Sequence, residues 1–145
     1  MKQFIQYLIV LVIFVRCGYE ADQNNQEKFE SWLNDHRIPA NERLSKFDYH
    51  APNELPVEYG KIEKTIIGDT LTVSFYTKQP VGCLLIGDIE ILENLIVLKF
   101  GQACSPYEDG MVTEEADLLL TYQIKNGDDL KALPIQIEGL TNLLK

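Results

Sequence analysis

The sequence predicts a mainly β fold: a small antiparallel β-sandwich or partly open barrel of about six strands, with one short N-terminal helix. Three observations lead to this prediction. Apolar and polar residues alternate in three successive pairs of short segments, which is typical of β-hairpins. Helical patterns between these segments are too few for parallel βαβ units. The apolar content of 46% is enough for one core, so residues 29–145 are predicted to form a single β-rich domain.

The first predicted hairpin joins residues 62–67 to residues 70–77 through Gly68-Asp69, a favourable two-residue turn. The turn fixes which residues face each other. The buried face then pairs Ile66 with Leu71 and Ile62 with Phe75, and the outer face pairs Thr65 with Thr72 and Glu63 with Ser74. Only Lys64, opposite Val73, breaks the alternation.

The second predicted hairpin runs from Cys83 to Cys104 around a turn at Glu93-Asn94. One face pairs Ile91 with Ile96, Ile89 with Leu98, Gly87 with Phe100, Leu85 with Gln102 and Cys83 with Cys104, while a wetter face places Asp88 opposite Lys99 and Glu90 beside Val97. The cysteines then form a non-hydrogen-bonded pair, whose Cα atoms lie about 4.5 Å apart, so a disulfide can close. We predict this disulfide; two free buried thiols, the alternative, suit a cytoplasmic protein better.

A third hairpin is predicted near the C-terminus. Residues 118–125 alternate between apolar and polar side chains, and Asn126-Gly127-Asp128-Asp129 is a turn sequence. Residues 133–137 then return as the second strand. Because Pro134 cannot donate a backbone hydrogen bond, that strand is expected at the edge of a sheet.

The region before the hairpins contains one helical pattern. Phe29, Trp32, Leu33 and His36 follow the i, i+3, i+4, i+7 spacing of a short amphipathic helix. This helix is expected to lie on the domain, with binding to a partner as the alternative. Residues 38–56 hold three prolines and little periodicity, and are expected to wrap irregularly around the domain.

The first sixteen residues have the pattern of an export signal. Lys2 precedes an apolar run from Phe4 to Val15. As a helix this run would be about 18 Å long, whereas a bilayer core needs about 30 Å, so we interpret residues 1–16 as a signal peptide. The polar residues 17–28 that follow are interpreted as a tether, which places the remaining domain outside the cytoplasm.

Phe14-Val15-Arg16-Cys17 resembles the site at which bacterial lipoproteins are cleaved and lipidated, although small residues usually stand where Arg16 does. The resemblance covers the first two dozen residues and implies that Cys17 carries a lipid. The odd count of three cysteines agrees, because lipidation of Cys17 leaves the other two to pair. The acidic Tyr19-Glu20-Ala21-Asp22 resembles tracts that direct some Bacteroidetes-type lipoproteins to the cell surface. An ordinary cleaved signal, with Cys17 lost or idle, is the alternative.

Net charge limits the possible partners. The signal holds two of the 13 basic residues and none of the 22 acidic ones, which leaves 11 against 22 and a formal charge of −11. Nucleic acid phosphates and anionic lipid headgroups would repel such a chain. Attachment to a membrane is therefore expected through a lipid, and the expected partner is an envelope or extracellular protein.

The segment 105–117 is the most acidic part of the predicted domain. Its candidate binding residues are Tyr107, Glu108, Asp109, Glu114, Glu115 and Asp117. They are predicted to present an acidic surface to a protein or small ligand. A merely solvated loop is an alternative. Calcium binding is another, although the regular spacing of acidic calcium loops is missing and no cofactor is predicted.

No motif for phosphate binding, nucleophilic catalysis or zinc binding occurs, so the sequence predicts a non-catalytic binding domain. The first alternative is a hydrolase or transferase with a dispersed site, for which Glu108, Asp109 and His50 are candidates. Asp88 and Glu90 could act as a carboxylate pair on a sugar, but pairing of Asp88 with Lys99 explains one of them more simply. A purely structural part of an envelope complex is the third possibility.

Overall fold

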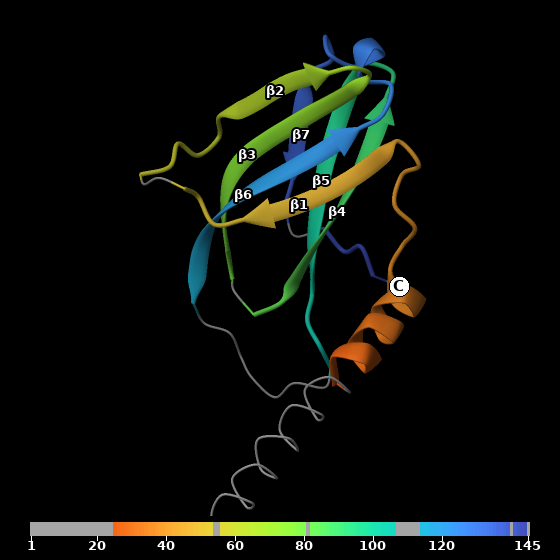
Figure 1. Ribbon diagram of the computed structural model, residues 1–145, viewed down its shortest axis with the longest axis vertical. Helices are drawn as coiled ribbons and strands as arrows, with labels where there is room; N and C mark the ends of the chain where they lie inside the picture. The colour runs from red at the N-terminus through yellow and green to blue at the C-terminus, as the bar shows by residue number, and fades with distance from the viewer. Residues whose placement is uncertain (1–24, 54–55, 81, 107–113, 140, 145) are drawn as a thin grey trace, which may run out of the picture. The chain divides into compact units, whose positions relative to one another are not determined.

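A computed structural model describes residues 25–53, 56–80, 82–106, 114–139 and 141–144. The chain divides into two compact units. The smaller includes a helix at residues 25–36, and the larger takes in Arg37–Cys104 together with the described residues from 114 onward. The strands of the larger unit are β1 (Leu44–His50), β2 (Ile62–Ile67), β3 (Thr70–Pro80), β4 (Leu84–Leu92), β5 (Leu95–Ala103), β6 (Glu115–Ile124) and β7 (Ile135–Glu138) (Figure 1).

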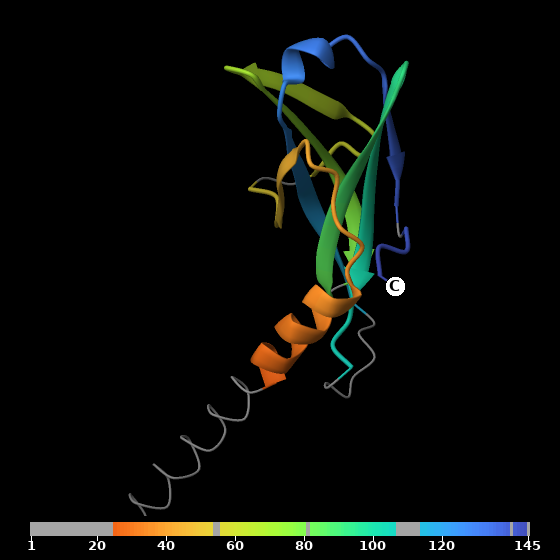
Figure 2. The ribbon, with the colours of Figure 1, turned by 90° about the vertical axis from the view of Figure 1, so that its right-hand side faces the viewer.

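These strands form two sheets. One has the order β1-β6-β3-β2 with antiparallel neighbours throughout, and the other has the order β4-β5-β7. Figure 2 shows the two sheets as separate layers, with the inner face of each turned toward the other. The predicted mainly β sandwich is therefore confirmed.

The core lies between the sheets because every second residue of the central strands is apolar and points inward. Fully buried positions come from both layers: Leu71, Val73, Leu120, Tyr122 and Ile124 from one, and Ile96 and Leu98 from the other. Burial of each such side chain stabilises the folded state by about 1.5–3 kcal/mol, because it removes apolar surface from water. This burial is the main driving force for the packing of the two layers.

Tyr122 on β6 connects the layers through the core. Its ring packs edge-on against Phe47, at a centroid distance of 4.9 Å, and stacks with Phe75 at 6.1 Å. The hydroxyl donates a hydrogen bond to the backbone carbonyl of Lys99 on β5, with an O···O distance of 2.8 Å. Burial, and to a lesser degree the charge of Asp88, raises the pKa of Tyr122 well above its usual value, so the phenol stays neutral.

Both of the first two predicted hairpins have the expected register. β2 pairs with β3 so that Ile62 faces Phe75 and Ile66 faces Leu71. β4 pairs with β5 from Leu84 and Ala103 to Leu92 and Leu95 around Glu93-Asn94. Turn position and alternation together determine these registers, because a slip by one residue would expose every inward side chain.

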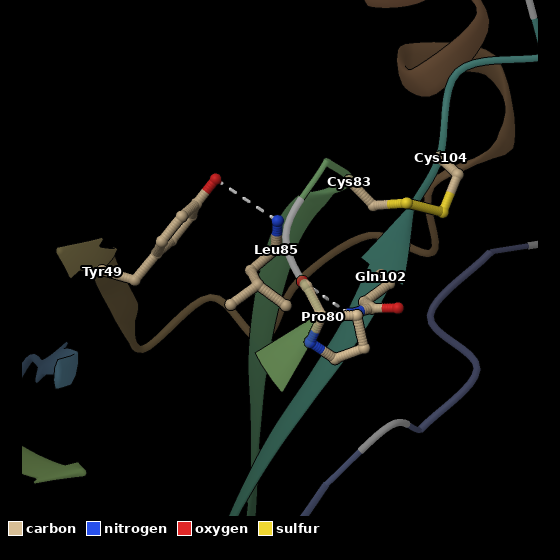
Figure 3. Close-up of a disulfide and its surroundings, with 6 residues drawn as sticks. All are labelled: Tyr49, Pro80, Cys83, Leu85, Gln102 and Cys104. Atoms are coloured by element: carbon tan, nitrogen blue, oxygen red, sulfur yellow. Dashed lines mark hydrogen bonds between the residues drawn. A yellow bond between two sulfur atoms is a disulfide. The ribbon is translucent and has the colours of Figure 1, made fainter. Parts of the chain in front are cut away.

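The predicted disulfide between Cys83 and Cys104 is present at the open end of the β4–β5 hairpin, with a Cα–Cα distance of 4.4 Å (Figure 3). Gln102, two residues before Cys104, donates a side-chain hydrogen bond to the carbonyl of Pro80 at 3.3 Å. Pro80 is the last residue of β3, so this contact ties the disulfide end of one sheet to the other sheet.

The outer face of the β4–β5 hairpin is less exposed to solvent than the sequence predicts. Ile86, Val97 and Ala103 on this face are buried. The C-terminal segment supplies part of the cover: a Cβ added at Gly101 would collide with the carbonyl oxygen of Thr141. Cover by a distant segment of the chain leaves no trace in the alternation of a strand, so this burial was not predictable.

The third predicted hairpin is wrong in its pairing. β6 and β7 lie in different sheets, and β7 runs parallel to β5, with Ile96 opposite Ile135. The reason is the connection: Asn126 has a left-handed backbone, η1 (Gly127–Asp129) follows, and buried Leu130 lies against the core as the chain crosses between layers. The edge position predicted from Pro134 is confirmed, since β7 borders its sheet.

The expectation of an irregular wrap over residues 38–56 is also wrong in part, because residues 44–50 form β1. This strand pairs with β6, placing Phe47 opposite Tyr122 and Tyr49 opposite Leu120. Alternation of Phe47 and Tyr49 with polar neighbours was the available signal. A register shift between Leu44 and Lys46 interrupts the alternation at the start of the strand.

The predicted N-terminal helix is present at residues 25–36 and begins within the segment that the sequence assigns to a tether. Its aromatic side chains stack along one face, with centroid distances of 6.0 Å from Phe29 to Trp32 and 4.7 Å from Trp32 to His36. Nδ1 of His36 also lies 2.8 Å from the carbonyl oxygen of Trp32. The prediction that this helix lies on the domain stays a prediction.

Gly87 on β4 allows the ring of Phe47 to approach the opposite sheet. A Cβ at this position would overlap the ring of Phe47. We expect Gly87→Ala to lower the free energy of unfolding by about 1–3 kcal/mol, because the ring must leave its position. Urea denaturation measures this change. Phe47→Leu should remove much of the added cost, so equal effects of Gly87→Ala in both backgrounds would contradict the packing.

Candidate functional site

The structure describes only part of the predicted acidic site. Glu114, Glu115 and Asp117 are described, and we call these three the acidic strand end. Tyr107, Glu108, Asp109 and the predicted lipidation residue Cys17 lie outside the described residues. The expected loop ends earlier than predicted, because β6 already begins at Glu115 and pairs with the last residues of β3, where Glu115 faces Pro80 and Asp117 faces Lys78.

The acidic strand end projects largely into solvent. Glu114 and Glu115 are exposed, and Asp117 is half-buried on the outer face of its sheet. Charges at such positions act over about one Debye length, roughly 8–10 Å at physiological salt. The acidic strand end can therefore attract a basic surface, and salt should weaken that attraction.

Tyr59 adds an aromatic group to this site that sequence reasoning missed. Its hydroxyl donates a hydrogen bond to Oδ1 of Asp117, and its backbone forms an isolated bridge with Tyr76. Tyr59 is 51% exposed as a residue, so it offers an aromatic contact surface next to the carboxylates. Nothing in the sequence near residue 117 indicates this contact, because 58 positions separate the two residues.

The bond to Asp117 raises the pKa of Tyr59, with smaller contributions from burial and from the charges of Asp117 and Glu115. A raised pKa means that the folded state favours the neutral phenol. The resulting stabilisation is complete below the ordinary tyrosine pKa of about 10 and is lost as the pH rises through the higher folded value.

Asp117→Asn should bring the pKa of Tyr59 back toward its ordinary value, because the neighbouring negative charge is gone. The measurement is an ultraviolet titration of tyrosinate, with Tyr59→Phe used to isolate the signal of this residue. Asp128→Asn, in η1, is the matched control and should leave the titration unchanged. An unaltered Tyr59 titration in Asp117→Asn would contradict the assigned hydrogen bond.

A partly satisfied glutamine lies inside the same end of the sandwich. Gln79 on β3 faces Ala116 of β6 and is 5% exposed. Its Nε2 donates to Oγ1 of Thr77 at 3.0 Å, while Oε1 has no hydrogen-bond partner among the described residues. Burying an amide side chain costs free energy for each hydrogen bond that it does not make.

The carboxylates considered for sugar chemistry have structural partners. Asp88 accepts backbone hydrogen bonds from Asn41, at 2.7 Å, and Ile89, at 2.8 Å. Lys99 bonds to Glu90 at 2.6 Å, not to Asp88 as the cross-strand register suggested, and this bond raises the pKa of Lys99. Lys99 bonds to Glu90, its diagonal neighbour on the adjacent strand, because a lysine side chain is long enough to reach it.

The catalytic candidates are not brought together by the described residues. His50 is the exposed last residue of β1, and its proposed companions Glu108 and Asp109 are not described. Within the ranges that the structure describes, no group of three or more His, Cys, Asp or Glu side chains is placed to hold a metal ion. No helix in those same ranges has the length and apolar character needed to cross a membrane.

No family model, curated protein or solved structure matches this chain.

Proposed function

We propose that this chain is an exported, non-catalytic binding domain, held at an envelope membrane by a lipid on Cys17, which recognises a protein partner through its acidic strand end. The observation that carries the proposal is the Cys83–Cys104 disulfide. Structural disulfides form and persist in oxidising compartments and are rare in the cytoplasm. The apolar run that ends at Cys17 supports export independently.

Lipid attachment fits the charge of the chain. A mature domain with a formal charge of −11 gains nothing from anionic headgroups, so a covalent anchor is the consistent means of membrane association. Stable anchoring by acyl chains needs more than one of them, and the lipidated cysteine of the lipoproteins that Cys17 resembles would supply such an anchor.

The acidic strand end has the features of a polar interaction surface. Two exposed carboxylates, Glu114 and Glu115, are close in sequence to Asp117, whose Oδ1 accepts a hydrogen bond from the hydroxyl of Tyr59. Tyrosine is enriched at protein interfaces, and charges around it favour one partner and speed association. The expected partner is therefore a protein with a basic patch.

The test is recovery of partners from envelope extract by the full chain. Changing Glu108, Asp109, Glu114 and Glu115 to alanine should abolish recovery of a basic partner, and raised salt should weaken recovery by the unaltered chain. The matched control changes four other acids, Glu42, Glu93, Asp128 and Asp129, which are exposed. Equal recovery by both quadruple variants would overturn the acidic strand end as the binding surface.

A further inference from the structure

A groove of about 440 Å³ opens between β1 and β4, the edge strands of the two sheets. Its walls are mainly apolar and include Leu44 and Phe47 from β1 and Leu84, Leu85 and Ile86 from β4. Leu84 is 37% exposed at the mouth of the groove, while Leu85 and Ile86 are buried. This volume lies within the range of about 300–1,000 Å³ that small-molecule sites occupy.

The strand edges that border the groove are poorly suited to adding a peptide strand. On β4, the amide of Leu85 donates to the hydroxyl of Tyr49 at 3.4 Å, and the carbonyl of Gly87 accepts from the guanidinium of Arg37 at 3.2 Å (Figure 3 shows the first). On β1, the amide of Tyr49 donates to Oδ1 of Asp48 at 3.0 Å. Side chains therefore occupy backbone groups that strand addition would require.

The groove also holds the guanidinium of Arg37, which forms no ion pair among the described residues. Lys46 and Asp48 at its rim pair with each other, with an N–O distance of 2.8 Å. Arg37 has no ion pair with any carboxylate in the described part of the chain, and its bond to the carbonyl of Gly87 holds the guanidinium at the groove. An arginine fixed in this way can bind a carboxylate through two parallel hydrogen bonds.

We propose that this groove binds a small amphiphile that carries one carboxylate. The apolar body lies against Phe47, Leu84 and Leu85, and the carboxylate pairs with Arg37. This site is separate from the acidic strand end, and neither proposal depends on the other.

Straight-chain fatty acids are suitable probes, used below their micelle-forming concentrations. Titration of the full chain with laurate should shift the backbone amide resonances of Phe47, Leu84 and Leu85 and saturate. Lauryl alcohol, which lacks the charge, and acetate, which lacks the apolar body, should each bind at least about tenfold more weakly. Shifts confined to other regions, or no saturable shift, would overturn the proposal.

Variants test the two halves of the site separately. Arg37→Gln should weaken laurate binding about tenfold or more and leave binding of lauryl alcohol unchanged, whereas Arg37→Lys should keep part of the difference. Arg43→Gln is the matched control, because Arg43 binds backbone carbonyls of Lys125 and Asn126 away from the groove. Leu84→Asp alters an exposed position and should reduce laurate binding without loss of the fold. Laurate affinities that are equal in Arg37→Gln and Arg43→Gln would contradict the role of Arg37.

Discussion

Replacement of Tyr122 by alanine is expected to cost about 3–5 kcal/mol of unfolding free energy, a large part of the stability of a domain this size. The ring is fully buried and fills the space between the sheets, so its removal leaves a cavity that the rigid strands can only partly close. Phe47 and Phe75, which contact the ring on two sides, lose packing together. The midpoint and slope of a urea denaturation curve give the change.

Two further variants separate packing from hydrogen bonding. Tyr122→Phe keeps the ring but removes the bond to the carbonyl of Lys99, and should cost about 1–2 kcal/mol. Gln123→Ala alters the next residue, which points away from the core, and should stay within about 0.5 kcal/mol. If the single variants Tyr122→Ala and Gln123→Ala lost similar amounts of unfolding free energy, Tyr122 would not connect the layers.

Loss of the disulfide is expected to lower the free energy of unfolding by about 3 kcal/mol. The two cysteines are 21 positions apart, and opening the loop between them restores conformational freedom to the unfolded chain. Changing Cys83 and Cys104 together to serine should lower the urea midpoint, and reduction of the unaltered chain should lower it by the same amount. Cys17→Ser is the matched control and should leave the midpoint unchanged. If reduction left the urea midpoint unchanged, the disulfide would not contribute to stability by restricting the unfolded chain.

Local signals in the sequence were sufficient for the hairpins. For β4 and β5, a turn, an alternation and a cysteine pair all require one register, so the disulfide and the inward face follow together. The β2–β3 pairing follows in the same way from Gly68-Asp69. Such agreement between independent local features is what makes a prediction from one sequence reliable.

Contacts between distant segments were not predictable in this way. Parallel pairing of β7 with β5 depends on the path that residues 125–134 take across the core, and alternation within β7 is the same for either partner. β1 was missed because prolines on both sides and the shifted register near Ser45 obscured its alternation. The contribution of Tyr59 was missed for a related reason: its contact with Asp117 joins two segments that share no sequence signal.

For the acidic residues, the sequence identified candidates but did not show where they lie in the fold. Composition alone identified the segment 105–117. Of its candidate binding residues the structure describes Glu114, Glu115 and Asp117; β6 begins at Glu115, and Asp117 accepts a hydrogen bond from Tyr59. The groove had no sequence signal at all, because its residues come from two stretches, 37–49 and 84–86, that meet only when the sheets pack. Cavities between layers are properties of packing, not of any one element.

The most direct test of the account is the intact mass of the chain isolated from the membrane fraction of its host, measured before and after reduction. We expect a chain that begins at Cys17, carries added lipid and gains the mass of two hydrogen atoms on reduction. A chain that keeps residues 1–16, lacks lipid and shows three free thiols would contradict export, anchoring and the disulfide together.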